Sequence, residues 1–236
     1  MDAEVHSLRA LALYAARLMD LSRAHPDAPT RAMGADMVDI LIPVVKAHIT
    51  ERAFAVTSTA MQVFGGSGYI EETGVAQLMR DVRISLIYEG TNGIQALDLA
   101  MRKIRLQQGE AVRAMIGEIT EFAQGLQAQE APVWAKQGQA LLDAARQLEL
   151  ATIWMLQQHR QAESEPSALM GVQSHASLYL ALFGEVFQAY LLFVAASRAQ
   201  SHPAMAAAAL NRAEFFRQQK LPYAAAKAQI ILGHTA

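Results

Sequence analysis

Apolar residues recur at intervals of three and four along nearly the whole chain, and alternating apolar and polar runs are absent from the sequence. The first such pattern is formed by Val5, Leu8, Leu11, Ala12, Ala15 and Met19. This spacing places apolar side chains on one face of an α-helix, whereas a half-buried strand requires alternation. Asp2 is positioned to cap the helix, and residues 25–29, which include two prolines, end it. The pattern predicts an all-α protein.

Prolines and glycines divide the first half of the chain into further helices. A short turn of helix is predicted over 36–41. Pro43 suits the first turn of a longer helix that extends to residue 64, because a missing N–H costs nothing there. The glycine-rich run 65–68 ends this helix, since glycine tolerates the positive φ of a helix C-cap. A further helix is predicted over 73–83.

The turn at 88–93 leads into one more helix, for which Thr91 and Asn92 are candidate caps. Its apolar face is formed by Ile94, Leu97, Met101 and Ile104. Three basic residues, Arg102, Lys103 and Arg105, fall in its last turns, where cations suit the helix dipole. We interpret them as a solvated helix end rather than as a binding patch.

The helical spacing of apolar residues is interrupted at residues 106–109, where we place a domain boundary between 1–106 and 107–236. The second part is predicted to hold helices at about 110–129, 133–161, 167–199, 204–219 and 223–232. Prolines at 132, 166, 203 and 222 mark the joints between these helices. Short connections between long helices make sequence neighbours antiparallel. The sequence therefore predicts an antiparallel helix bundle followed by a second helical bundle.

Residues 176–196 are long enough to span a bilayer and contain a single charge, Glu185. They also contain Ser177, Gln188 and Tyr190 and lack a flanking Lys/Arg cluster. We predict a buried bundle helix rather than a membrane span. Because the chain starts with an acidic amphipathic segment rather than a secretory signal, we expect a cytoplasmic protein.

The composition excludes several kinds of chemistry. With no Cys, the chain has no disulfide, thiolate metal site or cysteine nucleophile. The formal net charge is −2, and the two parts carry −1 each, without the basic excess of a nucleic-acid-binding protein. The seven histidines form no recognisable ligand pair, so we expect no metal site. These histidines are His6, His25, His48, His159, His175, His202 and His234.

Two segments hold candidate chemistry. In residues 62–69 the glycines permit close approach of the backbone to a ligand, although a plain helix C-cap and tight turn explains them as well. Glu89 is the sole carboxylate in the mostly apolar run 84–90 and follows Tyr88. Desolvation in such surroundings raises the proton affinity of a carboxylate, which suits a general base. An ordinary loop glutamate is the alternative interpretation.

Taken in order and spacing, three motifs resemble the C-terminal helical domain of the acyl-CoA dehydrogenase family. They are QVFGGSGYIEE at 62–72, MRDVRI at 79–84 and IYEGTNGIQ at 87–95. Residues 110–236 resemble the extra helical domain of a subset of that family, the members similar to 3-methylmercaptopropionyl-CoA dehydrogenase. The segments 183–196 and 203–232 carry this second resemblance.

The resemblance implies an FAD-dependent oxidoreductase that dehydrogenates an acyl-CoA thioester between its α and β carbons. Glu89 matches the family's catalytic base, which removes the α-proton while the β-hydride passes to N5 of the flavin. The backbone N–H of this glutamate and a flavin ribityl hydroxyl hold the thioester carbonyl and stabilise the developing enolate. Tyr88 and Gly90 would line the substrate pocket.

The family also shares its cofactor between subunits. Gln62, Gly65 and Gly66 match the segment that reaches the adenosine and pyrophosphate of a neighbouring subunit's FAD, and Thr91 matches a hydroxyl that contacts the flavin nucleotide. Gly93 departs from the family, which often has Gln or Glu there. The resemblance implies a homodimer or homotetramer, with electron-transfer flavoprotein as the electron acceptor.

The family's full fold contains an N-terminal helical domain and a middle β domain that this sequence does not contain. Since much of the flavin seat lies on those domains, we expect this chain alone to bind FAD weakly or not at all and to show no turnover. The alternative hypothesis is a helical oligomerisation or interaction module without catalysis.

Overall fold

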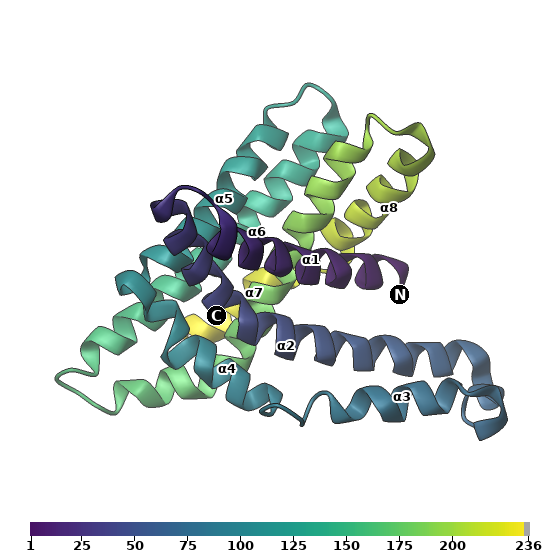
Figure 1. Ribbon diagram of the computed structural model, residues 1–236, viewed down its shortest axis with the longest axis horizontal. Coiled ribbons are helices and arrows are strands. Elements are labelled where there is room, and N and C mark those ends of the chain that lie inside the picture. The colour runs from purple at the N-terminus through teal and green to yellow at the C-terminus, as the bar shows by residue number, and fades with distance from the viewer. Residues whose placement is uncertain (234–236) are drawn as a thin grey trace.

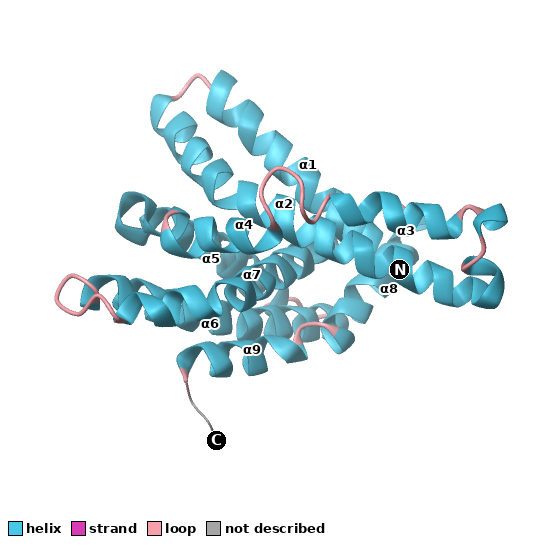
Figure 2. Cartoon of the chain, turned by 90° about the horizontal axis from the view of Figure 1, so that it is seen from below, coloured by secondary structure: helices cyan, strands magenta, loops and turns pink. Residues whose placement is uncertain are grey.

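The computed structural model describes residues 1–233, and all regular structure in this part of the chain is helical (Figures 1 and 2). The prediction of an all-α fold is confirmed. The helices are α1 (Asp2–Ala24), α2 (Ala28–Phe64), α3 (Val75–Ile84), α4 (Asn92–Met101), α5 (Glu110–Gln127), α6 (Pro132–Gln161), α7 (Ala168–Ala199), α8 (Pro203–Gln219) and α9 (Pro222–Leu232). Residues 234–236, which include His234, lie outside the described residues.

Helix α2 corrects the sequence prediction for the first half. It passes through Pro43 without a break, so the predicted turn at 36–41 and the predicted helix from residue 43 are parts of one helix. The helix begins earlier because the Asp27 carboxylate accepts a hydrogen bond from Thr30 N at 2.9 Å. A proline inside a helix removes a backbone hydrogen bond. Burial of Pro43, between fully buried Leu41 and Val44, offsets this cost.

The predicted cap of α1 is also wrong. Met1 occupies the N-cap position, and the Asp2 side chain makes no cap hydrogen bond. Its carboxylate instead accepts a hydrogen bond from Nε of Arg212 on α8 at 2.6 Å, so a contact distant in sequence replaces the local one. Thr91, in contrast, caps α4 as predicted, because its Oγ1 accepts from Ile94 N at 3.3 Å.

Helices α5–α9 begin and end within two residues of the predicted bounds. Proline occupies the first turn of α6, α8 and α9, where its fixed φ suits a helix start. Helix α7 is long and apolar enough to cross a membrane, but 72% of its most apolar window is buried. It runs through the middle of the bundle, with helices of both halves around it (Figure 1). This agrees with the prediction of a buried bundle helix.

Aromatic side chains of α7 form the centre of the core. Tyr179, Phe183, Phe187 and Phe193 are completely buried, and the rings of Phe183 and Phe187 stack with centroids 5.8 Å apart. Tyr14 of α1 packs edge-on against Phe187, with centroids 5.3 Å apart. The core is therefore continuous across the predicted boundary at residue 106, and the two halves pack as one body. The boundary itself stays a prediction.

A buried polar network also joins the two halves. His48 of α2 is almost completely buried, and its Nε2 forms a 2.7 Å hydrogen bond with Gln188 Oε1 of α7. Nearby, the Glu4 carboxylate forms ion pairs with Arg52 at 2.6 Å and Lys220 at 2.8 Å. Buried charges require such partners, because desolvation otherwise disfavours them. The network fixes α1 and α2 against the C-terminal helices.

The second half of α2 and helix α3 form an antiparallel pair that extends away from the bundle (Figures 1 and 2). The short turns η1 (Gly65–Gly68) and η2 (Glu71–Thr73) join them at the far end. We call this pair with its turns the arm. Large apolar side chains are exposed along it: Val63, Phe64, Tyr69, Ile70, Leu78 and Ile84.

Candidate functional site

The predicted catalytic glutamate lies in the turn between α3 and α4, at the base of the arm. Glu89 has φ of 57° and Gly90 has φ of 87°, so two successive residues adopt left-handed backbone. This conformation costs an L-residue other than glycine roughly 1–2 kcal/mol. The turn is closed by a hydrogen bond from Asn92 N to Leu86 O at 3.1 Å. A strained residue is therefore held at the position that the sequence singled out.

Side chains from two helices fasten this turn. Lys46 Nζ of α2 donates to Gly90 O at 2.5 Å and to Asn92 Oδ1 at 3.0 Å. Gln95 Nε2 of α4 donates to Glu89 O at 3.2 Å. The carbonyls of Glu89 and Gly90 are thus both fixed. Sequence reasoning missed Lys46, although it is the only Lys, Arg, Asp or Glu in the run 40–50, and such an isolated charge signals a specific partner.

The functional atoms of Glu89 remain available. Within residues 1–233, neither its carboxylate nor its backbone N–H forms a hydrogen bond. The expectation that Glu89 is desolvated is wrong for this chain, because the glutamate is exposed. The apolar neighbours that were expected to cover it are exposed themselves, with Ile87 at 50% and Tyr88 at 69%. The turn presents the glutamate without enclosing it.

Thr91 and Gly93 follow directly on the turn. The Thr91 Oγ1 accepts the cap hydrogen bond of α4, which leaves its O–H free to donate to another group. A Cβ placed on Gly93 would meet only Thr91 Oγ1, at 3.9 Å. The backbone therefore does not require glycine at position 93, and a Cβ would fit there.

The second predicted cluster lies at the far end of the arm. Gly65 caps α2 with φ of 60° and ψ of −146°, a conformation restricted to glycine, and its N–H donates to Gln62 O. Gly68 is buried, and a Cβ there would lie 2.5 Å from Met61 O. Gly66 differs from both, since it lacks a positive φ and a Cβ on it would meet nothing within 4 Å. Turn geometry explains Gly65 and Gly68 but gives no reason for Gly66.

The structure does not bring the two clusters together. Gln62 and Lys46 lie on the same helix and are separated along it by about 24 Å, at 1.5 Å per residue. Lys46 contacts the Glu89 turn, whereas Gln62, Gly65 and Gly66 lie at the tip. One chain therefore presents two distinct exposed surfaces at opposite ends of the arm.

The histidines serve structural contacts in the described part of the chain. His48 bonds Gln188, and His159 Nε2 bonds Ala100 O at 2.8 Å. Burial lowers the pKa of both imidazoles, which favours their neutral forms. No group of three His, Asp or Glu side chains is arranged to hold a metal ion in residues 1–233.

Known proteins resemble this chain over its whole described length. The 3-methylmercaptopropionyl-CoA dehydrogenase of Ruegeria pomeroyi is 46% identical over 113 residues, which cover 48% of this chain and 19% of that protein. The structure of Caenorhabditis elegans ACDH-11 in complex with C11-CoA matches 100% of this chain and 39% of its own, with a TM-score of 0.73 and 23% identity. An acyl-CoA dehydrogenase from Bacillus anthracis, complexed with FAD, matches 99% of this chain and 41% of its own, with a TM-score of 0.74 and 16% identity.

These matches show the fold. They also show that the chain spans about a fifth of the length of the Ruegeria pomeroyi protein. Two family models divide the sequence. The model described as acyl-CoA dehydrogenase, C-terminal domain, matches residues 1–104, and the one described as acetyl-CoA dehydrogenase C-terminal like matches residues 115–236. The chain therefore belongs to the acyl-CoA dehydrogenase family, of which it contains the C-terminal helical domain and the appended C-terminal-like domain.

Proposed function

We propose that this chain forms the C-terminal part of an FAD-dependent acyl-CoA dehydrogenase, in which Glu89 removes the α-proton of an acyl-CoA thioester. The observation that carries the proposal is the Glu89 turn. Its carbonyls are fixed by Lys46 and Gln95, while the carboxylate and the N–H of the same residue have no partner in residues 1–233. A fixed turn with free functional groups is preorganised for a ligand.

The residues of the turn divide the chemistry between them. The carboxylate of Glu89 accepts the α-proton, and its backbone N–H donates to the thioester carbonyl, where negative charge develops. Tyr88 and Gly90 flank the glutamate and line the acyl end of the site. FAD, when bound, supplies the acceptor for the β-hydride. Exclusion of water from Glu89 comes from outside the described chain, because its side chain is exposed here.

The cofactor contacts fall into two groups. The open backbone at Gly65 and Gly66, where a Cβ would meet nothing within 4 Å, fits close approach of a pyrophosphate, with Gln62 beside it. Thr91 lies at the other end of the arm and offers a free O–H to the flavin nucleotide. Because the two groups are about 24 Å apart along α2, we assign them to two different FAD molecules. The chain then functions within a homodimer or homotetramer.

We also place the boundary between the two domains at residue 106, in the segment that separates the two family matches. Electron-transfer flavoprotein as the electron acceptor and a cytoplasmic location complete the proposal. Family membership supports the acceptor, and reduction of that flavoprotein by the reconstituted enzyme would test it.

Two measurements test the catalytic assignment. The first adds FAD to the purified chain and records the visible spectrum, and we expect weak or no flavin binding and no turnover. The second co-expresses the chain with the N-terminal and β domains of a family member and measures acyl-CoA oxidation. Glu89→Gln should abolish the rate, while Glu121→Gln, a change to an exposed glutamate on α5, should leave it unchanged. Full activity of the Glu89→Gln enzyme would refute the assignment of the base.

The second candidate function is a helical oligomerisation or interaction module without catalysis. The exposed apolar side chains of the arm favour it, since contiguous exposed apolar surface marks an interaction site. Light scattering of the isolated chain separates the two. A defined dimer or tetramer, together with no turnover after co-expression, supports the module, whereas turnover after co-expression supports the enzyme.

A further inference from the structure

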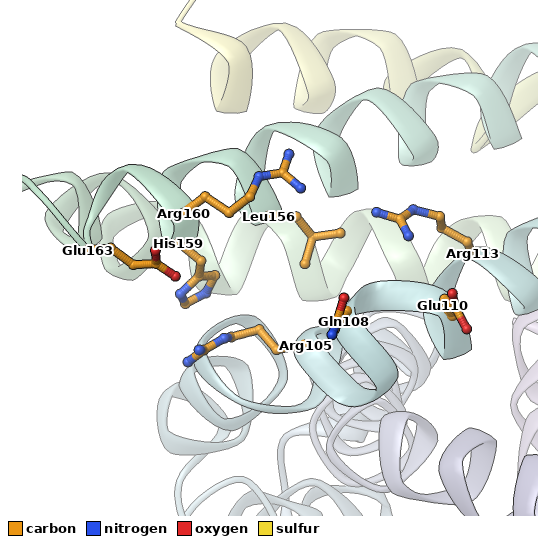
Figure 3. A pocket seen from close by; sticks show the side chains of 8 residues that line it. All are labelled: Arg105, Gln108, Glu110, Arg113, Leu156, His159, Arg160 and Glu163. Carbon is orange, nitrogen blue, oxygen red and sulfur yellow. The ribbon is translucent and has the colours of Figure 1, made fainter.

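A cavity of about 560 Å³ opens on the side of the bundle where α4 gives way to α5. It lies between the turn η3 (Lys103–Gly109), the first turns of α5 and the last turns of α6. Three guanidinium groups line it, from Arg105, Arg113 and Arg160 (Figure 3). The sequence could not group these residues, because they come from three separate elements.

The three arginine side chains have no partner among the described residues. In residues 1–233 none of their side chains forms a hydrogen bond or an ion pair, and neither do the two carboxylates of the cavity, Glu110 and Glu163. Three guanidinium groups and two carboxylates leave one positive charge in excess. Burial lowers the pKa of His159, which favours its neutral imidazole.

Two of the three guanidinium groups face one another in the cavity, and Arg105 lies nearer the end that holds His159 and Glu163 (Figure 3). The guanidinium groups of Arg113 and Arg160 point toward one another from either side of Leu156, whereas Glu163 lies beside His159 at the other end (Figure 3). Glu110 lies below Arg113 in the same view. The guanidinium groups of Arg113 and Arg160 therefore both border the space beside Leu156.

The floor of this space is closely packed. Leu156 is buried, and a Cβ on Gly109 would lie 2.7 Å from its Cδ1 and 3.5 Å from Arg113 Nη2. Gly109 follows Gln107 and Gln108, and all three have left-handed backbone, with φ of 89°, 49° and 56° respectively. Strain of this kind persists only where the surrounding structure fixes it. The strained turn holds the backbone close under Arg113.

From this arrangement we infer that the cavity binds a diphosphate group. A guanidinium fork matches phosphate or carboxylate oxygens, but a carboxylate offers only two oxygens in one plane. Arg113 and Arg160 approach from opposite sides, so a ligand that bonds both needs oxygens on more than one face, which a phosphate has. The additional charge of Arg105 and the volume of about 560 Å³ leave room for a second phosphate.

This site is separate from the proposed active site. The Glu89 turn precedes α4, and Arg105 follows it, so the length of α4, about 15 Å for its ten residues, lies between them. The inference therefore does not depend on the proposed function. A diphosphate could come from inorganic pyrophosphate or from a nucleotide, and the experiment distinguishes the two.

Isothermal titration of the 236-residue chain with inorganic pyrophosphate tests the site. We expect saturable binding that weakens with salt, and we expect Arg113→Gln or Arg160→Gln to weaken it at least tenfold, as loss of a charge-assisted hydrogen bond does. Arg160→Lys keeps the charge but loses the fork, so an intermediate affinity is expected. Arg146→Gln is the matched control, because Arg146 is an exposed arginine of α6 outside the cavity.

The same titration with ADP shows whether the diphosphate group belongs to pyrophosphate or to a nucleotide. Equal affinity for ADP and pyrophosphate supports recognition of the phosphates alone, and tighter binding of ADP supports a nucleotide. Circular dichroism of each variant establishes that its helices are intact. If neither ligand binds, or if Arg146→Gln weakens binding as much as Arg160→Gln does, the inferred site is overturned.

Discussion

Gly184→Ala should destabilise the fold, although alanine is the better helix former. Gly184 lies in the middle of α7, and a Cβ there would lie 2.4, 2.5 and 2.7 Å from three ring atoms of His48. Comfortable contacts between such atoms are about 3.5–4.0 Å, so the overlap is about 1 Å. The ring has no room to retreat, because it is buried and bonded to Gln188 at 2.7 Å.

The magnitude follows from three contributions. Overpacking of a core costs about 1–3 kcal/mol, and displacement of the buried His48–Gln188 hydrogen bond costs about another 1–3 kcal/mol. Replacement of glycine by alanine within a helix stabilises the helix by about 1 kcal/mol. We therefore expect the free energy of unfolding to fall by about 1–5 kcal/mol. Urea denaturation followed by far-UV circular dichroism measures it.

Gly117→Ala is the matched control. Gly117 lies within α5, and a Cβ on it would meet nothing within 4 Å. Only the helix propensity changes, so this variant should be more stable by about 0.5–1 kcal/mol. In a His48→Ala background, Gly184→Ala should cost much less, because the ring is gone. Equal stabilisation by Gly184→Ala and Gly117→Ala would refute the steric reasoning.

Three further predictions concern the turn, the network and the arm. Lys46→Met removes the donor to Gly90 O, and amide hydrogen exchange in the turn should become roughly tenfold faster, as loss of about 1.4 kcal/mol implies. Burial raises the pKa of Glu4, but hydrogen bonds from Arg52 and Lys220 outweigh it and hold the pKa below its ordinary value. Stability from this group is complete above that value and is lost as the pH falls through the folded pKa, so Glu4→Gln should flatten the acid limb of the stability curve. Gly66→Ala should leave the melting temperature of the chain unchanged yet weaken FAD binding after co-expression, and a lower melting temperature would instead assign Gly66 to the fold.

The helices of the second half could be predicted from the sequence because local chemistry determines their ends. Pro132, Pro203 and Pro222 occupy first turns, and a proline at a helix start acts through its own φ, without help from the rest of the fold. Pro43 misled the prediction for the opposite reason. Its backbone cost is offset by burial, and a local pattern contains no information about that burial.

The residues of the candidate site could likewise be predicted only where local sequence determines them. The family motifs identified Glu89, but its surroundings depend on tertiary structure, and the expected apolar cover is absent from the described chain. Lys46 reaches the turn from a helix more than forty positions earlier in the sequence, so spacing alone could not pair it with Gly90. Arg105 is exposed, as a solvated helix end implies, but its place beside Arg160 in one cavity depends on tertiary structure.

The proposed reaction requires a positioned base and exclusion of water from that base, and this chain meets only the first requirement. Positioning of the Glu89 backbone is complete within this chain, since Gln95 and Lys46 bond the carbonyls of Glu89 and Gly90. Exclusion of water from Glu89 is not complete within this chain, since Tyr88 is 69% exposed and the glutamate beside it is exposed as well. A base whose backbone is positioned but whose side chain is solvated lacks the low-dielectric surroundings in which proton abstraction is effective. Changes to Lys46 should therefore alter the turn in the isolated chain and the assembled enzyme alike, whereas changes to the exposed apolar side chains of the arm should matter only after assembly.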